Sequence, residues 1–121
     1  MDEQADGWYL AGKVEDFEDE DVEQLWVGAF PVAVYRAEGK FYATQDECTH
    51  EFAYLSDGVV VDCVVECPFH QGRFDVRDGK ALSAPVVVGL KTFPVKIENG
   101  NIYVQVTKEA TDAAVMPSRP R

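Results

Sequence analysis

Two short motifs of cysteine and histidine constrain this chain more than any other feature of its sequence. Cys48 and His50 lie in "CTH", and Cys67 and His70 lie in "CPFH". The chain has only these two histidines, so each of them is accompanied by a cysteine. One sulfur and one imidazole from each of two segments suit either a tetrahedral zinc ion or a 2Fe-2S cluster with two histidine ligands. The pattern therefore predicts a metal centre built from two loops.

The spacing within the motifs favours the cluster over zinc. Zinc ribbons and fingers usually present a C-x2-4-C pair that closes a tight turn around one ion, and the C-x-H pair is too short for that turn. A binuclear cluster instead needs two ligands from each loop that diverge to different irons. We therefore expect Cys48 and Cys67 to bind one iron, and His50 and His70 to bind the other.

Length and composition are those of a single compact domain. The 121 residues are 46% hydrophobic and 27% charged, and a chain of this size can bury one core. No apolar run approaches the roughly 20 residues of a membrane span, and the start "MDEQADG" lacks the pattern of a secretory signal. We expect a cytoplasmic protein without a membrane partner. Three cysteines in a reducing compartment more often serve metals or chemistry than disulfides.

The net charge of −11 is spread unevenly along the chain. Residues 1–23 carry −9 and residues 45–75 carry −6, whereas residues 76–121 carry +3. Nucleic acid is excluded as a partner, because binding to a phosphate backbone needs clustered Lys and Arg. The acidic segment "VEDFEDEDVE" reads as a solvated loop, with a dedicated docking site as the alternative. The charge around the cysteines suggests docking onto basic surfaces.

Hydrophobic periodicity predicts an all-β chain. Short alternating or β-branched segments are separated by turn signals, and no stretch has a helical period for more than two turns. The expected strand segments are 7–12, 23–36 with a break at 28–31, 41–44, 58–67, 73–76, 85–98 and 102–106. They predict an antiparallel β-sandwich or small barrel over residues 1–107, with a cluster-binding subdomain at about 45–75. Residues 108–121 are expected to form a flexible tail.

Cys63 is expected to belong to the core and not to the metal site. If 58–67 is one regular strand, Cys63 shares a face with Val61 and Val65. It then lies four residues, or roughly 13 Å, from Cys67. That distance is too great for a fifth ligand to the same pair of irons.

With these motifs the chain resembles the Rieske family, and in particular the small Rieske-type ferredoxins of bacterial aromatic-ring-hydroxylating dioxygenase systems. The resemblance runs from about Trp8 to Val106 and includes "FYATQDECTH", "ECPFHQGRFDVRDGKAL" and "LKTFPVKIENGNIYVQV". It implies the Rieske fold, an antiparallel β-sandwich base with a small cluster-binding subdomain, and one Rieske 2Fe-2S cluster. It also implies a flavoprotein ferredoxin reductase as electron donor and a terminal oxygenase as acceptor.

The resemblance also implies a low reduction potential. High-potential Rieske proteins have an extra cysteine in each loop, which form a disulfide, and hydroxyl side chains that hydrogen-bond to the cluster. Here Ala53 and Phe69 occupy the two cysteine positions, and Gly72 and Phe74 occupy the two hydroxyl positions. Without these donors the reduced cluster is less stabilised. We predict a midpoint potential of about −150 mV, near the low end of the Rieske range.

Several residues near the ligands are candidates for tuning or docking. Glu51 and Gln71 depart from the commoner residues of the family, and Glu51 would place a carboxylate beside an imidazole if it turned inward. Phe52 and Phe69 could form an apolar docking rim or could pack beneath their loops. Pro85 lies in "SAPV", which resembles the loop that covers the cluster in relatives, although a plain surface turn is the alternative.

The residues that the chain lacks restrict its function to electron transfer. A Rieske oxygenase also needs a mononuclear iron held by two histidines and a carboxylate, and no histidine remains after the cluster is built. The glycines do not form a dinucleotide-binding motif. We therefore expect a monomeric one-electron carrier that is not itself an enzyme. One alternative is a small Rieske-like subunit of an assimilatory nitrite reductase, which size-exclusion behaviour and a large partner in its operon would distinguish. The other is a zinc-bound interaction module, which iron, sulfide and zinc analysis would distinguish.

Overall fold

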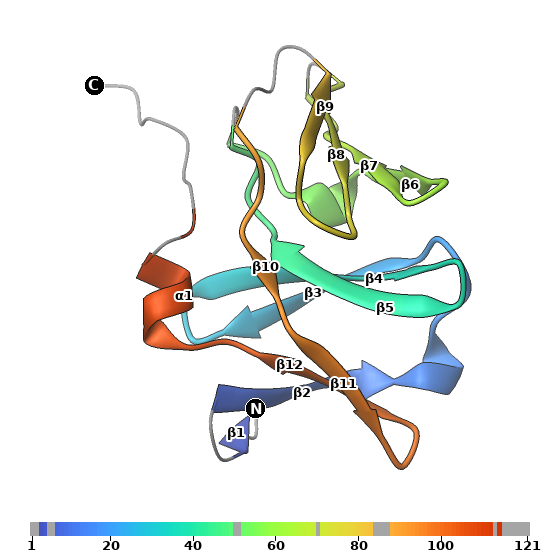
Figure 1. Ribbon diagram of the computed structural model, residues 1–121, viewed down its shortest axis with the longest axis vertical. Helices are drawn as coiled ribbons and strands as arrows, with labels where there is room; N and C mark the ends of the chain where they lie inside the picture. The colour runs from blue at the N-terminus through green and yellow to red at the C-terminus, as the bar shows by residue number, and fades with distance from the viewer. Residues whose placement is uncertain are drawn as a thin grey trace.

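The computed structural model describes residues 3–4, 7–49, 52–69, 71–83, 88–112 and 114, whose strands form three antiparallel four-stranded sheets (Figure 1). The first sheet contains, in spatial order, β1 (Glu3–Gln4), β2 (Trp8–Lys13), β12 (Asn101–Gln105) and β11 (Val95–Glu98). The second contains β10 (Thr92–Phe93), β5 (Lys40–Gln45), β4 (Phe30–Ala37) and β3 (Val22–Val27). The third contains β6 (Val59–Val61), β7 (Val64–Glu66), β8 (Arg73–Asp75) and β9 (Ala81–Ser83). This arrangement confirms the prediction of an all-β antiparallel fold.

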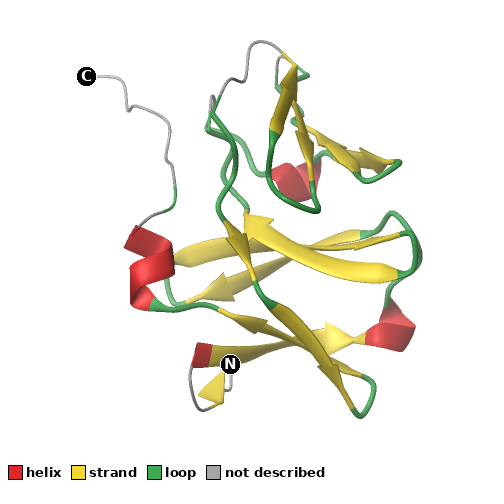
Figure 2. Cartoon of the chain, viewed as in Figure 1, coloured by secondary structure: helices red, strands yellow, loops and turns green. Residues whose placement is uncertain are grey.

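Among the described residues, helical structure is confined to short segments (Figure 2). Two 3-10 turns, η2 (Val14–Asp16) and η3 (Leu55–Asp57), connect strands, and α1 (Lys108–Asp112) follows the last strand. The sequence predicted a flexible tail from Lys108, whereas a helix forms there. The Ala110 N–H donates to Thr107 Oγ1 at 3.2 Å, and Ala110 packs against the core. None of the helices within the described ranges is long and apolar enough to cross a membrane.

Strand β4 is buried on both faces and separates two hydrophobic cores. Its side chains alternate, so Val32 and Val34 enter the core between the first and second sheets, while Ala33 and Tyr35 enter the core beneath the third sheet. The first and second sheets thus form a β-sandwich base. The third sheet packs on the other side of the second sheet and lies above the base in Figure 1.

Tight turns with positive φ angles set the hairpins. Asn99–Gly100 joins β11 to β12 with φ angles of 51° and 75°, which is the type I′ pattern that matches the twist of paired strands. Asp62 and Cys63 form the same kind of turn between β6 and β7, with φ angles of 52° and 65°. The prediction of one continuous strand over 58–67 is therefore wrong. The chain reverses at this turn although neither residue is a glycine.

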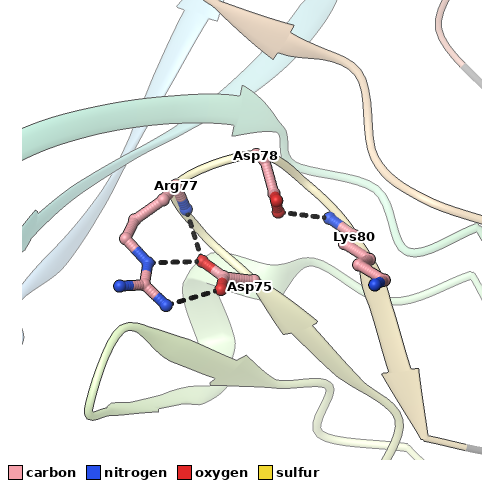
Figure 3. A network of polar contacts seen from close by, with 4 residues as sticks. All are labelled: Asp75, Arg77, Asp78 and Lys80. Carbon is pink, nitrogen blue, oxygen red and sulfur yellow. Dashed lines mark hydrogen bonds and ion pairs between the residues drawn. The ribbon is translucent and has the colours of Figure 1, made fainter.

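A network of charged side chains closes the turn between β8 and β9, which the sequence had indicated as a turn (Figure 3). The Asp75 carboxylate accepts hydrogen bonds from the Arg77 backbone N–H at 2.9 Å, from Nε at 3.0 Å and from Nη2 at 2.8 Å. Asp78 Oδ1 accepts from the Lys80 N–H at 3.0 Å. The hydrogen bonds from Arg77 hold the pKa of Asp75 below its ordinary value. The third sheet therefore continues past residue 75, where the sequence had placed the end of the subdomain, to Ser83.

Candidate metal centre

The first ligand segment is a short hairpin. The Cys48 N–H donates to the Ala53 carbonyl at 3.0 Å, and the Leu55 N–H donates to the Asp46 carbonyl at 2.7 Å, with one further bridge between them. Four residues separate Cys48 from Ala53, and His50 is the second of them. The cysteine thus lies at the last paired position before the tip.

The second ligand segment is the tip of the β7–β8 hairpin. Glu66 and Arg73 pair in the ladder, and the Cys67 N–H donates to the Gly72 carbonyl at 2.7 Å. Four residues again separate the cysteine from the closing residue, and His70 is the third of them. Both cysteines thus occupy the same position in hairpins with tips of equal length. The two spacings, C-x-H and C-x-x-H, differ only in where the histidine falls within the tip.

The two cysteines have the environment that a metal–thiolate site needs. Cys48 and Cys67 are each 1% exposed, belong to the same buried cluster, and are not in a disulfide. His50 and His70 lie outside the described residues, so their assignment as ligands stays a prediction. Within the described ranges no three Cys, His, Asp or Glu side chains are placed so that they could hold a metal ion together. Two thiols at adjacent hairpin ends, with one imidazole in each tip, form a donor set that fits a Rieske cluster.

Sequence reasoning missed Asp46, a buried carboxylate two residues before Cys48. Asp46 Oδ2 accepts hydrogen bonds from Gln24 Nε2 at 2.6 Å and from Ser56 Oγ at 2.9 Å, and Oδ1 accepts from the Ser56 N–H at 2.8 Å. Burial raises the pKa of Asp46, while these hydrogen bonds act in the opposite direction. An acidic residue so near a predicted ligand was the only signal in the sequence, because its partners come from distant segments.

The segment before β10 is tied to the first loop on both sides of Cys48. Thr49 Oγ1 donates to the Val88 carbonyl at 2.7 Å. The Gln45 N–H donates to the Lys91 carbonyl at 2.9 Å, and the Lys91 N–H donates to Gln45 Oε1 at 2.8 Å. Three stretches of chain, around residues 45–49, 67–72 and 88–91, therefore build this end of the molecule.

Three of the five residues proposed for tuning or docking can be placed. Phe52 is 37% exposed and Phe69 is 56% exposed, so both rings lie at the surface. Gln71 is also exposed and has a φ of 57°, a conformation that glycine adopts more easily than glutamine. Glu51 and Pro85 lie outside the described residues.

Cys63 is 1% exposed, which confirms the prediction that it belongs to the core. The reason given for its burial was wrong, since Val61 is 52% exposed and does not share its environment. Cys63 instead lies in the β6–β7 turn, where its carbonyl accepts from the Val76 N–H at 2.9 Å. Burial raises the pKa of its thiol, and Glu38 acts in the same direction.

Known proteins with this arrangement were found by sequence and by structure. A model of the family described as "Rieske [2Fe-2S] domain" matches residues 7–94. The chain is 45% identical over 100 residues to "Naphthalene 1,2-dioxygenase system, ferredoxin component" of Pseudomonas putida, covering 83% of this chain and 96% of the relative.

Two solved structures show the same fold. The first, titled "Complex of reduced oxygenase and oxidized ferredoxin in carbazole 1,9a-dioxygenase", matches with a TM-score of 0.79 and 40% identity over 83% of this chain and 94% of that chain. The second is a putative NADH-dependent nitrite reductase small subunit from Mycobacterium tuberculosis, with a TM-score of 0.73 over 83% of this chain and 95% of that chain. Its identity is 22%, so this second likeness shows the fold alone.

Proposed function

The chain belongs to the Rieske [2Fe-2S] domain family, and from this premise we propose that it is the ferredoxin of an aromatic-ring-hydroxylating dioxygenase system. It takes electrons one at a time from a flavoprotein ferredoxin reductase and passes them to a terminal Rieske non-heme iron oxygenase. The observation that carries this proposal is the pair of matched hairpins, each with a buried cysteine at its end and a histidine in its tip. The ferredoxin components among the relatives support it.

We propose that Cys48 and Cys67 hold one iron of the cluster, and that His50 and His70 hold the other. When bound, the cluster supplies one-electron redox chemistry at a low potential. The protein contributes the two closed hairpins, which fix the cysteines, and the surrounding apolar side chains, which exclude water from the sulfur side. Phe74 and Ala53 line this side and carry no hydroxyl or thiol that could donate to a cluster sulfur. Fewer such donors favour a low potential.

Partner docking is proposed to occur at the end of the molecule that carries the two tips. Phe52 and Phe69 offer exposed aromatic surface there, and residues 45–75 carry a net charge of −6. An apolar rim within an acidic surface suits a partner with a basic docking face. The protein is proposed to act in the cytoplasm as a monomer, and not to catalyse a reaction itself.

Spectroscopy and electron-transfer assays test this function. The purified protein should be reddish-brown, contain about two irons and two sulfides per chain, and give the EPR signal of a Rieske centre when reduced. It should also be reduced by the flavoprotein reductase, and reoxidised by the oxygenase, of a naphthalene dioxygenase system. A colourless protein with one zinc per chain would contradict the proposal, as would a loaded cluster that neither component can reduce or oxidise.

A further inference from the structure

We infer that Gln24, Asp46 and Ser56 form a hydrogen-bonded latch that positions the Cys48 loop relative to the cluster. The inference rests on the proposed binding of the cluster by this loop. It assigns a role to a buried carboxylate that the ligand set does not use. Asp46 is in this sense a positioning residue, because it acts on the cluster only through the loop.

The latch joins the two strands of the first hairpin below the cysteine. Asp46 lies on the entering strand and Ser56 follows the leaving strand, and two hydrogen bonds of 2.8 and 2.9 Å connect the carboxylate to the Ser56 N–H and hydroxyl. The Asp46 N–H also donates to the Pro31 carbonyl at 3.1 Å, at the start of β4. The base of the loop is therefore tied both across itself and to the second sheet.

Gln24 connects the same carboxylate to strand β3. Its Nε2 donates to Asp46 Oδ2 at 2.6 Å, while its Oε1 accepts from Trp26 Nε1 at 2.8 Å. The indole N–H is only a donor, so it fixes the orientation of the Gln24 amide and directs the NH2 group toward Asp46. Because Asp46 is fully buried, loss of this donor would leave one of its oxygens without full compensation.

The two ligand loops differ in how they are supported, and this difference indicates what the latch does. The Cys67 loop is the tip of a hairpin whose strands are flanked by β6 and β9, so three ladders fix its base. The Cys48 loop is flanked on its entering side only, where the Gln45 and Asp46 N–H groups donate to the Lys91 and Pro31 carbonyls. Its own pairing is an isolated bridge and two backbone hydrogen bonds. Among the described residues no strand pairs with its leaving side, and the hydrogen bonds of the latch to Ser56 hold that side.

Variants of the cluster-loaded protein at Gln24, Asp46 and Ser56 test the latch. Gln24→Met removes the donor to Asp46 without changing the net charge. Asp46→Asn places an NH2 group opposite the Gln24 NH2 group and so breaks the contact. The double variant Gln24→Glu with Asp46→Asn exchanges donor and acceptor, and it restores both the contact and the net charge. Val104→Ala is the control for general destabilisation, because Val104 is buried in the base core, which contains none of the latch residues. Ser56→Ala is a milder variant that keeps the backbone N–H donor if the others fail to fold.

The readouts are the EPR spectrum of the reduced cluster and the rate of iron loss to a chelator. We expect Gln24→Met and Asp46→Asn to shift or broaden the g-values and to release iron about three- to tenfold faster, as the loss of one partly buried hydrogen bond to a carboxylate would allow. The exchanged pair should restore the parent spectrum, and Val104→Ala should leave it unchanged. Ser56→Ala should change both readouts in the same direction but less.

Parent spectra in both Gln24→Met and Ser56→Ala would overturn the inference while leaving the proposed function intact. A change of the EPR g-values in Asp46→Asn with none in Gln24→Met would also overturn it, since the loss of the Asp46 charge alone would then explain the effect. A parent protein without a 2Fe-2S cluster would overturn the proposed function, and the inference with it.

Discussion

Tyr35 shows how a single buried hydroxyl connects strands β4 and β5 just before the first predicted ligand loop. Its hydroxyl lies 2.8 Å from Thr44 Oγ1, and Thr44 Oγ1 donates to the Gln45 carbonyl at 2.8 Å. The proton of Thr44 is thus engaged, so Tyr35 is the donor in their shared hydrogen bond. Burial raises the pKa of Tyr35 far above its ordinary value, which keeps this donor protonated.

Replacement of Tyr35 by Phe should lower the free energy of unfolding by about 1 kcal/mol, because it leaves the buried Thr44 oxygen without its donor. Chemical denaturation of the two proteins measures this difference. Tyr54→Phe is the control, since Tyr54 is 37% exposed and its hydroxyl can bond to water. Equal losses in the two variants would mean that the buried hydrogen bond adds nothing to stability.

At the level of elements, the sequence predicted the all-β class and most of the strands, but not the reversal within 58–67. The alternation in β4 is visible in the letters, with Val32 and Val34 on one face and Ala33 and Tyr35 on the other. The reversal at Asp62–Cys63 could not be predicted in this way, because it carries neither the Gly nor the Asn that usually signals a type I′ turn.

For the metal centre, the sequence motifs indicate four candidate ligands, which stay a prediction, but not how the two loops are held. The equal length of the two tips depends on hydrogen bonds such as the one from Cys48 to Ala53, which have no local sequence pattern. The latch was also beyond prediction, since Gln24 and Asp46 are 22 residues apart and meet only through the packing of the second sheet against the loop.

The β8–β9 turn approaches the segment before β10 so closely that one glycine should be irreplaceable. Gly79 has a φ of 78°, and a Cβ there would lie 2.3 Å from the Leu90 carbonyl oxygen. Gly39 has a similar φ of 76° but open space around it. Gly39→Ala should cost about 1–2 kcal/mol for its backbone conformation, and Gly79→Ala clearly more. Thermal melts of both variants would compare them, and equal losses would show that the close approach is not constraining.

The Asp75 network should make this turn sensitive to acid. The folded-state pKa of Asp75 lies below its ordinary value because of Arg77, so its stabilising contribution is fully present above the unfolded pKa of about 3.9 and is lost as the pH falls through the folded pKa. Asp75→Asn should therefore reduce the dependence of Tm on pH below about pH 4. Asp112→Asn removes the same charge from the exposed end of α1 and is the control. Parallel Tm curves for Asp75→Asn and the parent protein would refute this assignment.

On the scale of the whole molecule, charge is separated along the chain as function requires. Residues 1–23 and 45–75 carry −9 and −6, and the remainder is close to neutral or weakly positive. The second acidic stretch contains both cysteines proposed as ligands, so the field is negative at the end where partners are proposed to dock. Such a field accelerates encounter with a basic surface and is screened by salt.

Electron transfer with a protein partner should therefore slow as the ionic strength rises. The second-order rate constant for reduction by the flavoprotein reductase is expected to fall by about an order of magnitude between low ionic strength and 0.5 M salt. Stopped-flow kinetics measures this rate constant. Photoreduction by a neutral dye is the control and should not change, and a reductase rate that also stayed constant would exclude electrostatic steering.

The reduction potential should reflect the residues around the sulfurs. With Ala53, Phe69, Gly72 and Phe74 in place of thiol and hydroxyl side chains, we expect a midpoint of about −150 mV. A redox titration followed by visible absorbance gives this value. Phe74→Tyr, which adds a hydroxyl on the buried face, should raise the midpoint, and a parent value above about +100 mV would contradict the prediction.

The Asn99–Gly100 turn lies at the far end of the base from the third sheet (Figure 1). A Cβ at Gly100 would have no neighbour within 4 Å, so a group attached at this turn would meet open space and its cost would be that of the positive φ alone. A protein fixed to an electrode through this turn would stand upright, with its ligand hairpins facing the solution. The base would then act as an insulating spacer of uniform thickness, and a film of such molecules would exchange electrons with a dissolved partner more readily than with the electrode beneath it.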